Sequence, residues 1–250
     1  MKVSIVIPAY NEEKRITRTL ESYVNYFRPF ARGENLHVEL LVVLNGCKDN
    51  THDVVEQLRE QYSEIRMLDL KAAGKGLAIA AGFKDALTRP NDLIGFVDAD
   101  MATAPEYFYD LIKKINGYDG IIASRYMPGA DVYPPRPRMK YWGRRLVYDK
   151  LVFLLFGMNY YDLQCGAKLF KREVIEKIVS EFSVRQWAFD VELLYLAKKY
   201  GFKVKEIPTV WRDQADSKLT PVRSGLRMLS AVIKLRVRHS PFKGLVAPEV

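Results

Sequence analysis

The first half of the chain alternates short, almost wholly apolar runs with longer segments in which apolar residues recur every three or four positions. The short runs predict buried strands and the longer segments predict amphipathic helices. The expected strands are Val3–Ile7, Val38–Leu44, Ile65–Leu70, Leu93–Val97 and Gly120–Ala123. The expected helices are Glu12–Phe27, Asn50–Tyr62, Lys75–Thr88 and Pro105–Asn116. This alternation predicts an α/β fold whose mostly parallel sheet is flanked by helices on both faces.

The second half of the pattern is more basic and is interrupted by prolines. Tyr133–Pro137 predicts an irregular loop over the sheet edge, because proline fits neither a helix interior nor a central strand. Three further helices are expected, the first of them basic and amphipathic: Met139–Tyr160, Trp187–Tyr200 up to Gly201, and Arg223–Arg238. The apolar side of the last one should carry Leu226, Leu229, Val232 and Ile233. We expect one domain over residues 1–215, with the amphipathic segment at about 138–160, and a basic C-terminal helix and tail over 216–250.

The chain is basic, with 39 Lys and Arg against 30 Asp and Glu, and 48% of its residues are hydrophobic. That hydrophobic content is typical of a globular protein with a core. The excess charge is uneven: residues 136–150 hold six Lys/Arg and one acid, and residues 217–248 hold seven and none. Because large apolar residues are interleaved in both segments, the segments suit an anionic membrane surface or a nucleic acid as well as a solvated surface.

The cysteines and histidines indicate the cellular compartment and the kind of metal site to expect. Cys47 and Cys165 are the two cysteines, too few for a disulfide framework, and they favour a reducing, intracellular location. The three histidines are scattered, which gives a zinc site of the His/Cys type little support. Met1 leads directly into the first expected strand, so no signal peptide is predicted, and no run reaches the roughly 20 apolar residues that span a bilayer.

Two carboxylates directly follow the expected strand Leu93–Val97, in Asp98-Ala99-Asp100. Ligands of parallel α/β sheets bind at the carboxyl ends of the strands. Carboxylates one residue apart repel each other, and a divalent cation relieves this repulsion while bridging to a diphosphate. Alone, the pair fits equally well a polar loop that caps the helix after it.

Polar residues also follow other strands. Pro8-Ala9-Tyr10-Asn11-Glu12 leads into a helix whose N-terminus favours anions, and Asn45–Asp49 forms a turn after the second strand. Ala73-Gly74-Lys75-Gly76 places a lysine between two glycines that permit close backbone approach to a phosphate. Each of these loops alone fits an ordinary cap or turn. Because all fall at strand ends on one edge, they predict together a site for a nucleotide diphosphate held through a metal ion.

Four later stretches complete a resemblance to a known family. They are Ser124-Arg125-Tyr126, Asp162-Leu163-Gln164-Cys165-Gly166-Ala167-Lys168-Leu169-Phe170, Arg185-Gln186-Trp187-Ala188-Phe189-Asp190-Val191-Glu192-Leu193-Leu194, and Trp211 with Ser217-Lys218-Leu219. With the strand-end loops, they make the chain resemble the family 2 inverting glycosyltransferases with a GT-A domain over roughly residues 1–240. Within that family it resembles the polyprenyl-phosphate group and, most closely, the dolichyl-phosphate β-glucosyltransferases. The resemblance implies transfer of a hexose from a nucleotide-sugar to dolichyl (polyprenyl) phosphate, with inversion and with Mg²⁺ or Mn²⁺ as cofactor.

The resemblance and the loop positions suggest roles for individual residues. Asp98 and Asp100 are the expected metal ligands. The expected nucleotide-sugar-binding residues are Pro8, Tyr10, Asn11, Glu12, Asn45, Lys75, Asp98, Ala99, Asp100, Gln164 and Trp187. The acceptor phosphate is largely dianionic at pH 7 and needs positioning more than deprotonation, for which the candidates are Arg125, Arg136, Arg138, Arg144 and Lys218. The expected catalytic set is Asp100, Arg125, Asp162 and Asp190.

Asp162 and Asp190 have two interpretations. They orient the acceptor or the sugar hydroxyls, or they form buried ion pairs with Arg125 or Lys168, since a carboxylate on an apolar face needs a partner or a function.

Departures from the family pattern bear on the donor. Leu44-Asn45-Gly46-Cys47 stands in place of the usual Asp-Asp-Gly-Ser turn, and Asn45 keeps one acceptor oxygen, which suits uracil N3–H. Ala102 stands where dolichyl-phosphate mannose synthases often have glutamine. Both departures favour UDP-glucose. A GDP-mannose-dependent mannose synthase and a family 2 transferase with a non-lipid sugar acceptor remain alternatives.

The eukaryotic glucose enzymes usually carry a membrane anchor, and none is expected from this sequence, so amphipathic helices would have to meet the lipid at the cytoplasmic face. The expected apolar face comprises Trp142, Leu146, Val147, Phe153, Leu154 and Phe156. A core helix or a dimer contact is the alternative, and the oligomeric state stays open. A nucleic-acid-binding module would leave the two long motifs unexplained, so we expect no nucleic acid partner.

Overall fold

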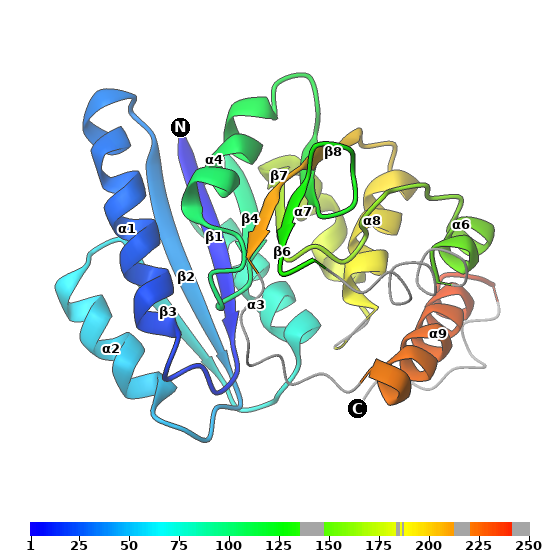
Figure 1. Ribbon diagram of the computed structural model, residues 1–250, viewed down its shortest axis with the longest axis horizontal. Helices are drawn as coiled ribbons and strands as arrows, with labels where there is room; N and C mark the ends of the chain where they lie inside the picture. The colour runs from blue at the N-terminus through cyan, green and yellow to red at the C-terminus, as the bar shows by residue number, and fades with distance from the viewer. Residues whose placement is uncertain (136–147, 184–185, 187, 213–220, 242–250) are drawn as a thin grey trace.

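The computed structural model describes residues 1–135, 148–183, 186, 188–212 and 221–241, the stretch 221–227 by its backbone alone. Seven strands form the central sheet in the order β3-β2-β1-β4-β7-β5-β8. Their bounds are β1 (Lys2–Ala9), β2 (His37–Asn45), β3 (Ile65–Leu70), β4 (Leu93–Val97), β5 (Gly120–Ser124), β7 (Ala167–Lys171) and β8 (Val204–Pro208). In Figure 1, β1 and β2 run from the upper edge, near the N-terminus, to the lower edge, so their carboxyl ends lie together there.

The sheet is parallel except at β7, which runs antiparallel to both of its neighbours, β4 and β5. A separate two-stranded parallel sheet pairs β6 (Asp131–Tyr133) with β9 (Val210–Arg212). Tyr133 therefore ends a short strand, so the expected irregular loop begins one residue later, at Pro134, and its residues 136 and 137 lie outside the described part.

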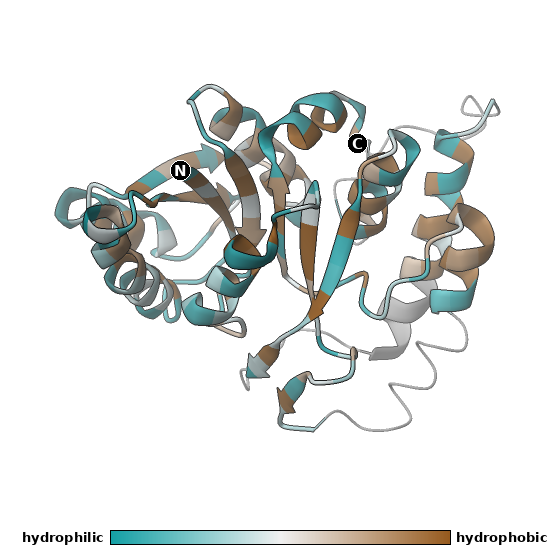
Figure 2. Ribbon diagram, turned by 90° about the horizontal axis from the view of Figure 1, so that it is seen from above, coloured by the Kyte–Doolittle hydropathy of each residue, from teal (hydrophilic) through white to brown (hydrophobic). Residues whose placement is uncertain are grey.

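Helices cover both faces of the sheet. One face packs against α1 (Ile16–Gly33), α2 (Thr51–Gln61) and α4 (Pro105–Lys114), and the other against α3 (Lys75–Leu87), α7 (Arg172–Ile178) and α8 (Phe189–Lys199). Side chains of β1 alternate between the two cores, Ile5 facing the first and Val6 the second. Strands buried on both faces are mostly apolar, and much of their length is brown in Figure 2. The predicted α/β fold with a mostly parallel sheet is confirmed.

The first helix starts later than expected. The expected range begins at Glu12, yet α1 begins at Ile16, the first of the regularly spaced apolar residues, because Asn11 takes a left-handed conformation (φ 56°) and the Glu12 carbonyl closes a turn with the Arg15 N–H at 2.9 Å. The buried face of α1 is the one expected, and it includes Leu20, Tyr23 and Phe27.

Two helices, α6 (Lys150–Phe156) and α9 (Pro221–Arg238), pack on each other beside α8. The expected helix Met139–Tyr160 ends at Phe156, because Gly157 takes a left-handed conformation (φ 64°), and its residues 139–147 lie outside the described part. On α9, Val232 and Leu235 are buried, whereas Ile233, expected on the apolar side, is half exposed. The expected domain division at residue 215 also falls outside the described residues.

Candidate active site

A cavity of about 480 Å³ lies at the carboxyl ends of β1, β2 and β4. Its lining consists of Pro8, Tyr10, Glu12, Arg15, Asn45, Ala73, Gly74, Lys75, Asp98, Ala99, Asp100 and Gln186. Parallel strands that deliver their ends to one edge explain why the loops after β1, β2 and β4 meet here although they are far apart in sequence. Eight of the expected nucleotide-sugar-binding residues belong to this lining: Pro8, Tyr10, Glu12, Asn45, Lys75, Asp98, Ala99 and Asp100.

Lys75 and Asp98 form an ion pair across the cavity, with 2.5 Å between Lys75 Nζ and Asp98 Oδ1. The lysine begins α3, directly after Gly74, and its ammonium lies 5.9 Å from the centre of the Phe96 ring. Burial alone would lower the pKa of Lys75, but the negative charges of Asp98, Asp190 and Asp100 outweigh it and raise this pKa. Lys75 thus presents a fixed positive charge beside the carboxylate pair.

Asp100 is held in the loop after β4, where its Oδ1 accepts the Ala102 N–H at 3.0 Å and Met101 is left-handed (φ 60°). Burial and the nearby charge of Asp98 raise the pKa of Asp100. A cation would remove this repulsion. Among the described residues no group of three or more His, Cys, Asp or Glu is placed to hold a metal. A pair of carboxylates nonetheless fits Mg²⁺, which is commonly held by one or two carboxylates plus substrate phosphates.

Helix α1 fixes the loop that carries the carboxylates. Thr19 Oγ1 donates to the Ala99 carbonyl at 2.7 Å, and Tyr23 Oη donates to the Thr103 carbonyl at 2.9 Å, both buried. From the other side, the Gly166 carbonyl accepts the Asp98 N–H at 3.0 Å. A Cβ at Gly166 would lie 1.9 Å from Asp98 Oδ2, so only glycine leaves room for the carboxylate. Sequence reasoning did not assign Gly166 to the site, because its partner belongs to a strand about 70 residues earlier.

Glu12 and Arg15 line the cavity as a bidentate pair, with Nε to Oε2 and Nη2 to Oε1 both at 2.7 Å. The Glu12 carboxylate is therefore already bound to a guanidinium. Arg15 adds a second positive charge near Asp100, and its charge lowers the pKa of that carboxyl against the larger opposing effects. Sequence reasoning missed Arg15, although its place three residues after Glu12 is a signal for such a pair.

The Asn45 side chain links two loops through hydrogen bonds to their backbones. Its Nδ2 donates to the Ala9 carbonyl at 2.8 Å, and its Oδ1 accepts the Gly74 N–H at 3.2 Å. The side chain is buried, and the acceptor oxygen that the sequence suggested for a uracil is already engaged with the backbone. Asn45 thus joins the ends of β1 and β2 to the glycine loop before α3.

Arg125 and Asp162 form a buried ion pair outside the lining of the cavity. Arg125 Nε and Nη2 lie 2.6 and 2.9 Å from the two Asp162 oxygens, and the guanidinium lies 4.8 Å from the centre of the Trp211 ring. Burial alone would lower the pKa of Arg125, but Asp162 raises it. Asp162 Oδ1 also accepts the Gln164 N–H at 3.2 Å, which shapes the loop leading to Gly166. Of the two interpretations for Asp162, the ion pair with Arg125 is the one observed.

A second buried pair joins Lys168 of β7 to Asp190 of α8, with 2.5 Å between Nζ and Oδ1. The ammonium also donates to the Cys165 carbonyl at 2.7 Å. Lys168 is fully buried, so its charge requires a partner of this kind. Here too the ion pair offered by the sequence is observed.

Some expected site residues stand apart from the cavity. Those described but outside its lining are Asn11, Arg125, Asp162, Gln164 and Asp190. Asn11 Oδ1 accepts the Lys48 N–H at 2.8 Å, and Gln164 Nε2 lies 3.4 Å from Tyr148 Oη. Those outside the described residues are Arg136, Arg138, Arg144, Trp187 and Lys218. Gln186 also lines the cavity, and the sequence indicates it only as part of the motif over residues 185–194.

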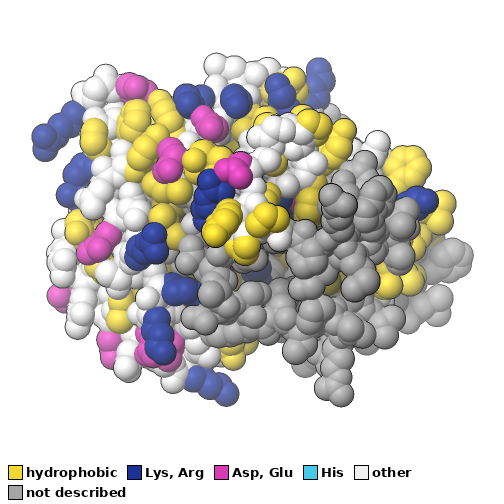
Figure 3. Space-filling model, viewed as in Figure 1, with side chains coloured by type: hydrophobic (Ala, Val, Ile, Leu, Met, Phe, Trp, Pro, Cys, Tyr) yellow, Lys and Arg dark blue, Asp and Glu magenta, His cyan; other side chains and the backbone are white. Residues whose placement is uncertain are grey.

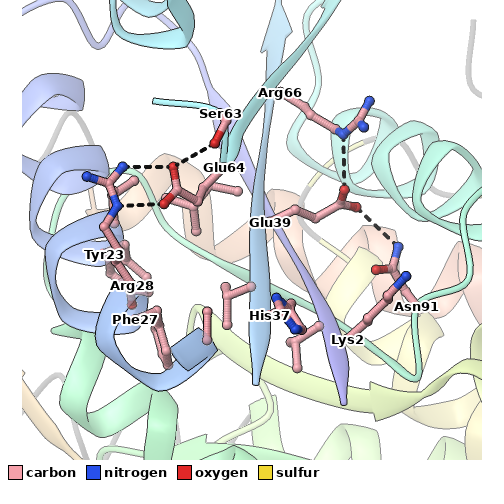
Figure 4. Close-up of a pocket in the computed structure, with 15 residues that line it drawn as sticks. Lys2, Tyr23, Phe27, Arg28, His37, Glu39, Ser63, Glu64, Arg66 and Asn91 are labelled. Atoms are coloured by element: carbon pink, nitrogen blue, oxygen red, sulfur yellow. Dashed lines mark hydrogen bonds and ion pairs between the residues drawn. The ribbon is translucent and has the colours of Figure 1, made fainter. Parts of the chain in front are cut away.

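A smaller cavity of about 350 Å³ lies at the opposite, amino-terminal ends of β1 and β2 (Figure 4). Both of its carboxylates already have partners: Glu64 binds Arg28 with Nε to Oε1 at 2.7 Å, and Glu39 lies between Arg66 and Asn91. It holds no carboxylate pair like Asp98 and Asp100. The chemistry therefore points to the cavity at the carboxyl ends.

Comparison with known proteins places the chain in a family. Residues 4–179 match the model described as glycosyl transferase family 2. The chain is 36% identical over 225 residues to dolichyl-phosphate beta-glucosyltransferase of Trichomonas vaginalis, covering 86% of this chain and 65% of that one. It is 32% identical over 251 residues to the Homo sapiens dolichyl-phosphate beta-glucosyltransferase, covering 95% and 76%. The chain thus spans just under two thirds of the Trichomonas relative.

A solved structure agrees with the fold. The mannosyltransferase from Pyrobaculum calidifontis in complex with GDP-Man and Mn²⁺ superposes with a TM-score of 0.59 at 18% identity, over 99% of this chain and 65% of that one. At this identity the likeness shows the fold alone. The predicted GT-A fold is confirmed, and its sheet carries the carboxylate pair at its carboxyl edge. With more than half of its length matched by the family model, the chain belongs to glycosyl transferase family 2.

Proposed function

We propose that the protein transfers glucose from UDP-glucose to dolichyl (polyprenyl) phosphate with inversion, at the cytoplasmic face of a membrane. The observation that carries the proposal is the carboxylate pair Asp98 and Asp100 beside Lys75, in a cavity at the strand ends of a family 2 chain. Support for the glucose and the lipid comes from relatives named dolichyl-phosphate beta-glucosyltransferase.

Different residues of the cavity would bind different parts of the donor. A divalent cation, Mg²⁺ or Mn²⁺, held by Asp98 and Asp100 would supply positive charge to the diphosphate leaving group. Lys75 adds charge from the N-terminus of α3, where backbone N–H groups also favour phosphate. The Tyr10 ring is 42% exposed and offers an apolar surface to the nucleoside. Arg15 binds the Glu12 carboxylate and so offsets its negative charge near the phosphates.

Arg125 acts through the loop that it braces. Its bond to Asp162 shapes the stretch 162–166, and Gly166 in turn packs on Asp98. We therefore assign Arg125 and Asp162 to positioning the carboxylate pair. Arg136, Arg138, Arg144 and Lys218 remain our candidates for the acceptor phosphate, because that dianion needs fixed positive charge for in-line attack on the anomeric carbon.

A donor and acceptor panel tests the proposal. The protein is incubated with UDP- and GDP-sugars, with Mg²⁺, Mn²⁺ or a chelator, and with dolichyl phosphate in detergent, and the glycolipid is separated and counted. We expect a glucolipid from UDP-glucose that disappears with the chelator. Mannolipid from GDP-mannose would assign the other lipid-linked sugar, and product only with a soluble sugar acceptor would overturn the lipid assignment.

The second part of the proposal is a peripheral membrane surface on α6 and α9. Leu154 is 80% exposed and Phe153 is 56% exposed on α6, and Ile233 is 50% exposed on α9. Lys150 and Lys234 are exposed beside them, and hydrophobic side chains gather at the edge of the molecule over α6 (Figure 3). Phe156, expected on this face, is buried instead. Among the described residues, no helix has the length and apolar character needed to cross a membrane.

Replacing Phe153 and Leu154 with serine should weaken binding to anionic vesicles by roughly a hundredfold, because each exposed apolar side chain contributes about 1.5 kcal/mol on insertion. Vesicle flotation measures the binding. Tyr133→Ser, which removes an exposed ring outside α6 and α9, is the control. Equal binding of the double variant and the wild type would rule out this surface.

A further inference from the structure

Helix α8 lies between the candidate active site and the two helices of the proposed membrane surface. Its first turn carries Asp190, whose carboxylate faces the sheet and binds Lys168 of β7. Lys168 in turn holds the Cys165 carbonyl, one residue before Gly166. The sheet-facing side of α8 is thus connected to the loop that positions Asp98.

Glu192 follows Asp190 by two residues, about 200° around the helix, and so points the other way. It is fully buried, and both its oxygens lie 3.0 Å from the Ser183 N–H. The ring Nε2 of His239 lies 2.9 Å from Glu192 Oε1, and His239 directly follows the last residue of α9. Burying this carboxylate is costly unless such donors are present, so the contact fixes the end of α9 to the first turn of α8.

Two further contacts fasten α6 and α9 to the same helix. The Tyr195 ring lies between the two, 4.9 Å from the Phe156 ring of α6 and 5.3 Å from the His239 ring. Lys198 Nζ donates to the Phe156 carbonyl at 3.2 Å and to the Gly157 carbonyl, which caps the end of α6. One helix therefore contacts the active-site loop through Asp190 and the two surface helices through Glu192, Tyr195 and Lys198.

We infer that Glu192 and His239 are positioning residues, which set the height and orientation of the active site over the membrane-borne acceptor. The inference rests on the proposed function. The apolar side of α9 packs on the core through the buried Val232 and Leu235 and the partly buried Met228, Leu229 and Ala231, and the polar contact at its end fixes the orientation of the last turn. A free α9 would still allow chemistry on an acceptor that diffuses in water, and would lose the fixed distance to one held in a bilayer.

The test uses the full chain and two acceptors: a long-chain polyprenyl phosphate in anionic vesicles, and a short, water-soluble prenyl phosphate. For His239→Gln and Glu192→Gln, we expect the KM for the vesicle-borne acceptor to rise about tenfold. Turnover with the short acceptor and the KM for UDP-glucose should stay within about twofold of wild type. His52→Gln, at an exposed histidine of α2 that also contacts a carboxylate, is the matched control.

Hydrogen exchange of the α9 amides gives a readout independent of catalysis, and it should quicken in both variants while the sheet stays protected. Equal losses with both acceptors would show a merely structural role and overturn the inference, as would unchanged kinetics in both variants. If His239→Gln does not fold, the test rests on Glu192→Gln, which keeps an acceptor oxygen for the Ser183 N–H. Wild-type protein that glycosylates neither acceptor would overturn the proposed function, and this inference with it.

Discussion

Asp100→Asn is expected to lower the turnover number for glycosyl transfer by about a thousandfold, because a metal ion stabilises developing charge by several kcal/mol and Asp100 is its expected ligand. The amide is isosteric, so Oδ1 keeps its hydrogen bond from the Ala102 N–H. Initial rates of glycolipid formation over a range of Mg²⁺ and Mn²⁺ concentrations measure the effect. Asp53→Asn, at an exposed carboxylate of α2, controls for the loss of one negative charge.

The Asp100→Asn variant should lose activity without losing stability. Burial and Asp98 raise the folded-state pKa of Asp100 above its unfolded-state value, so without a cation the ionised carboxylate destabilises the fold at neutral pH. That loss is regained as the pH falls through the folded-state pKa. Asp100→Asn removes the charge at every pH, and we expect a melting temperature at neutral pH no lower than that of wild type. Near-normal transfer by a well-folded variant would contradict the metal-ligand role.

Much of the site's location could be predicted from the sequence, because its elements are local. Strand β4 is an unbroken apolar run, and the carboxylates follow it directly. The glycines around Lys75 mark a turn in the same way, and once the strands are taken as parallel, both turns fall on one edge. The spacing of the hydrophobic residues and the chemistry of the residues directly after each strand are enough to predict where the site lies.

What the sequence could not provide is the partner of each buried charge. Asp162 and Asp190 both suited a catalytic role or an ion pair, and the choice depends on whether Arg125 and Lys168 lie opposite them in space. Strand β7 escaped prediction for a related reason. Ala167–Lys171 is only five residues long and contains Lys168, so it lacks an unbroken apolar run, and only its antiparallel place between β4 and β5 makes it a strand.

The buried pairs, β7 and the carboxylates form one connected structure. Arg125 holds Asp162, and Asp162 shapes the loop that ends at Gly166, whose missing side chain leaves room for Asp98. Lys168 continues from that loop to Asp190 and so to α8. Of the expected catalytic set, Asp100 lines the cavity beside Asp98, whereas Arg125, Asp162 and Asp190 lie outside the lining and are connected to the loop that packs on Asp98.

Gly166→Ala should reduce glycosyl transfer by about a hundredfold or more, since displacing a reacting group by about 1 Å costs that much. The new Cβ would lie 1.9 Å from Asp98 Oδ2 and 2.3 Å from its Cγ, so the carboxylate must rotate away from Lys75 or the loop must shift. Overpacking of this kind typically costs about 1–3 kcal/mol of unfolding free energy. We therefore expect a folded variant with weakened affinity for Mn²⁺ in the presence of nucleotide.

Gly33→Ala is the matched control, because a Cβ at that position meets no atom within 4 Å. Denaturant unfolding of both variants separates lost stability from lost catalysis, and a calorimetric titration with Mn²⁺ and UDP reports the metal site directly. If Gly166→Ala bound the metal as wild type does and turned over at the wild-type rate, Asp98 would tolerate displacement. The position of the Asp98 carboxylate would then not matter for transfer. The 162–166 loop would not be its support, and Arg125 and Asp162 would have no positioning role.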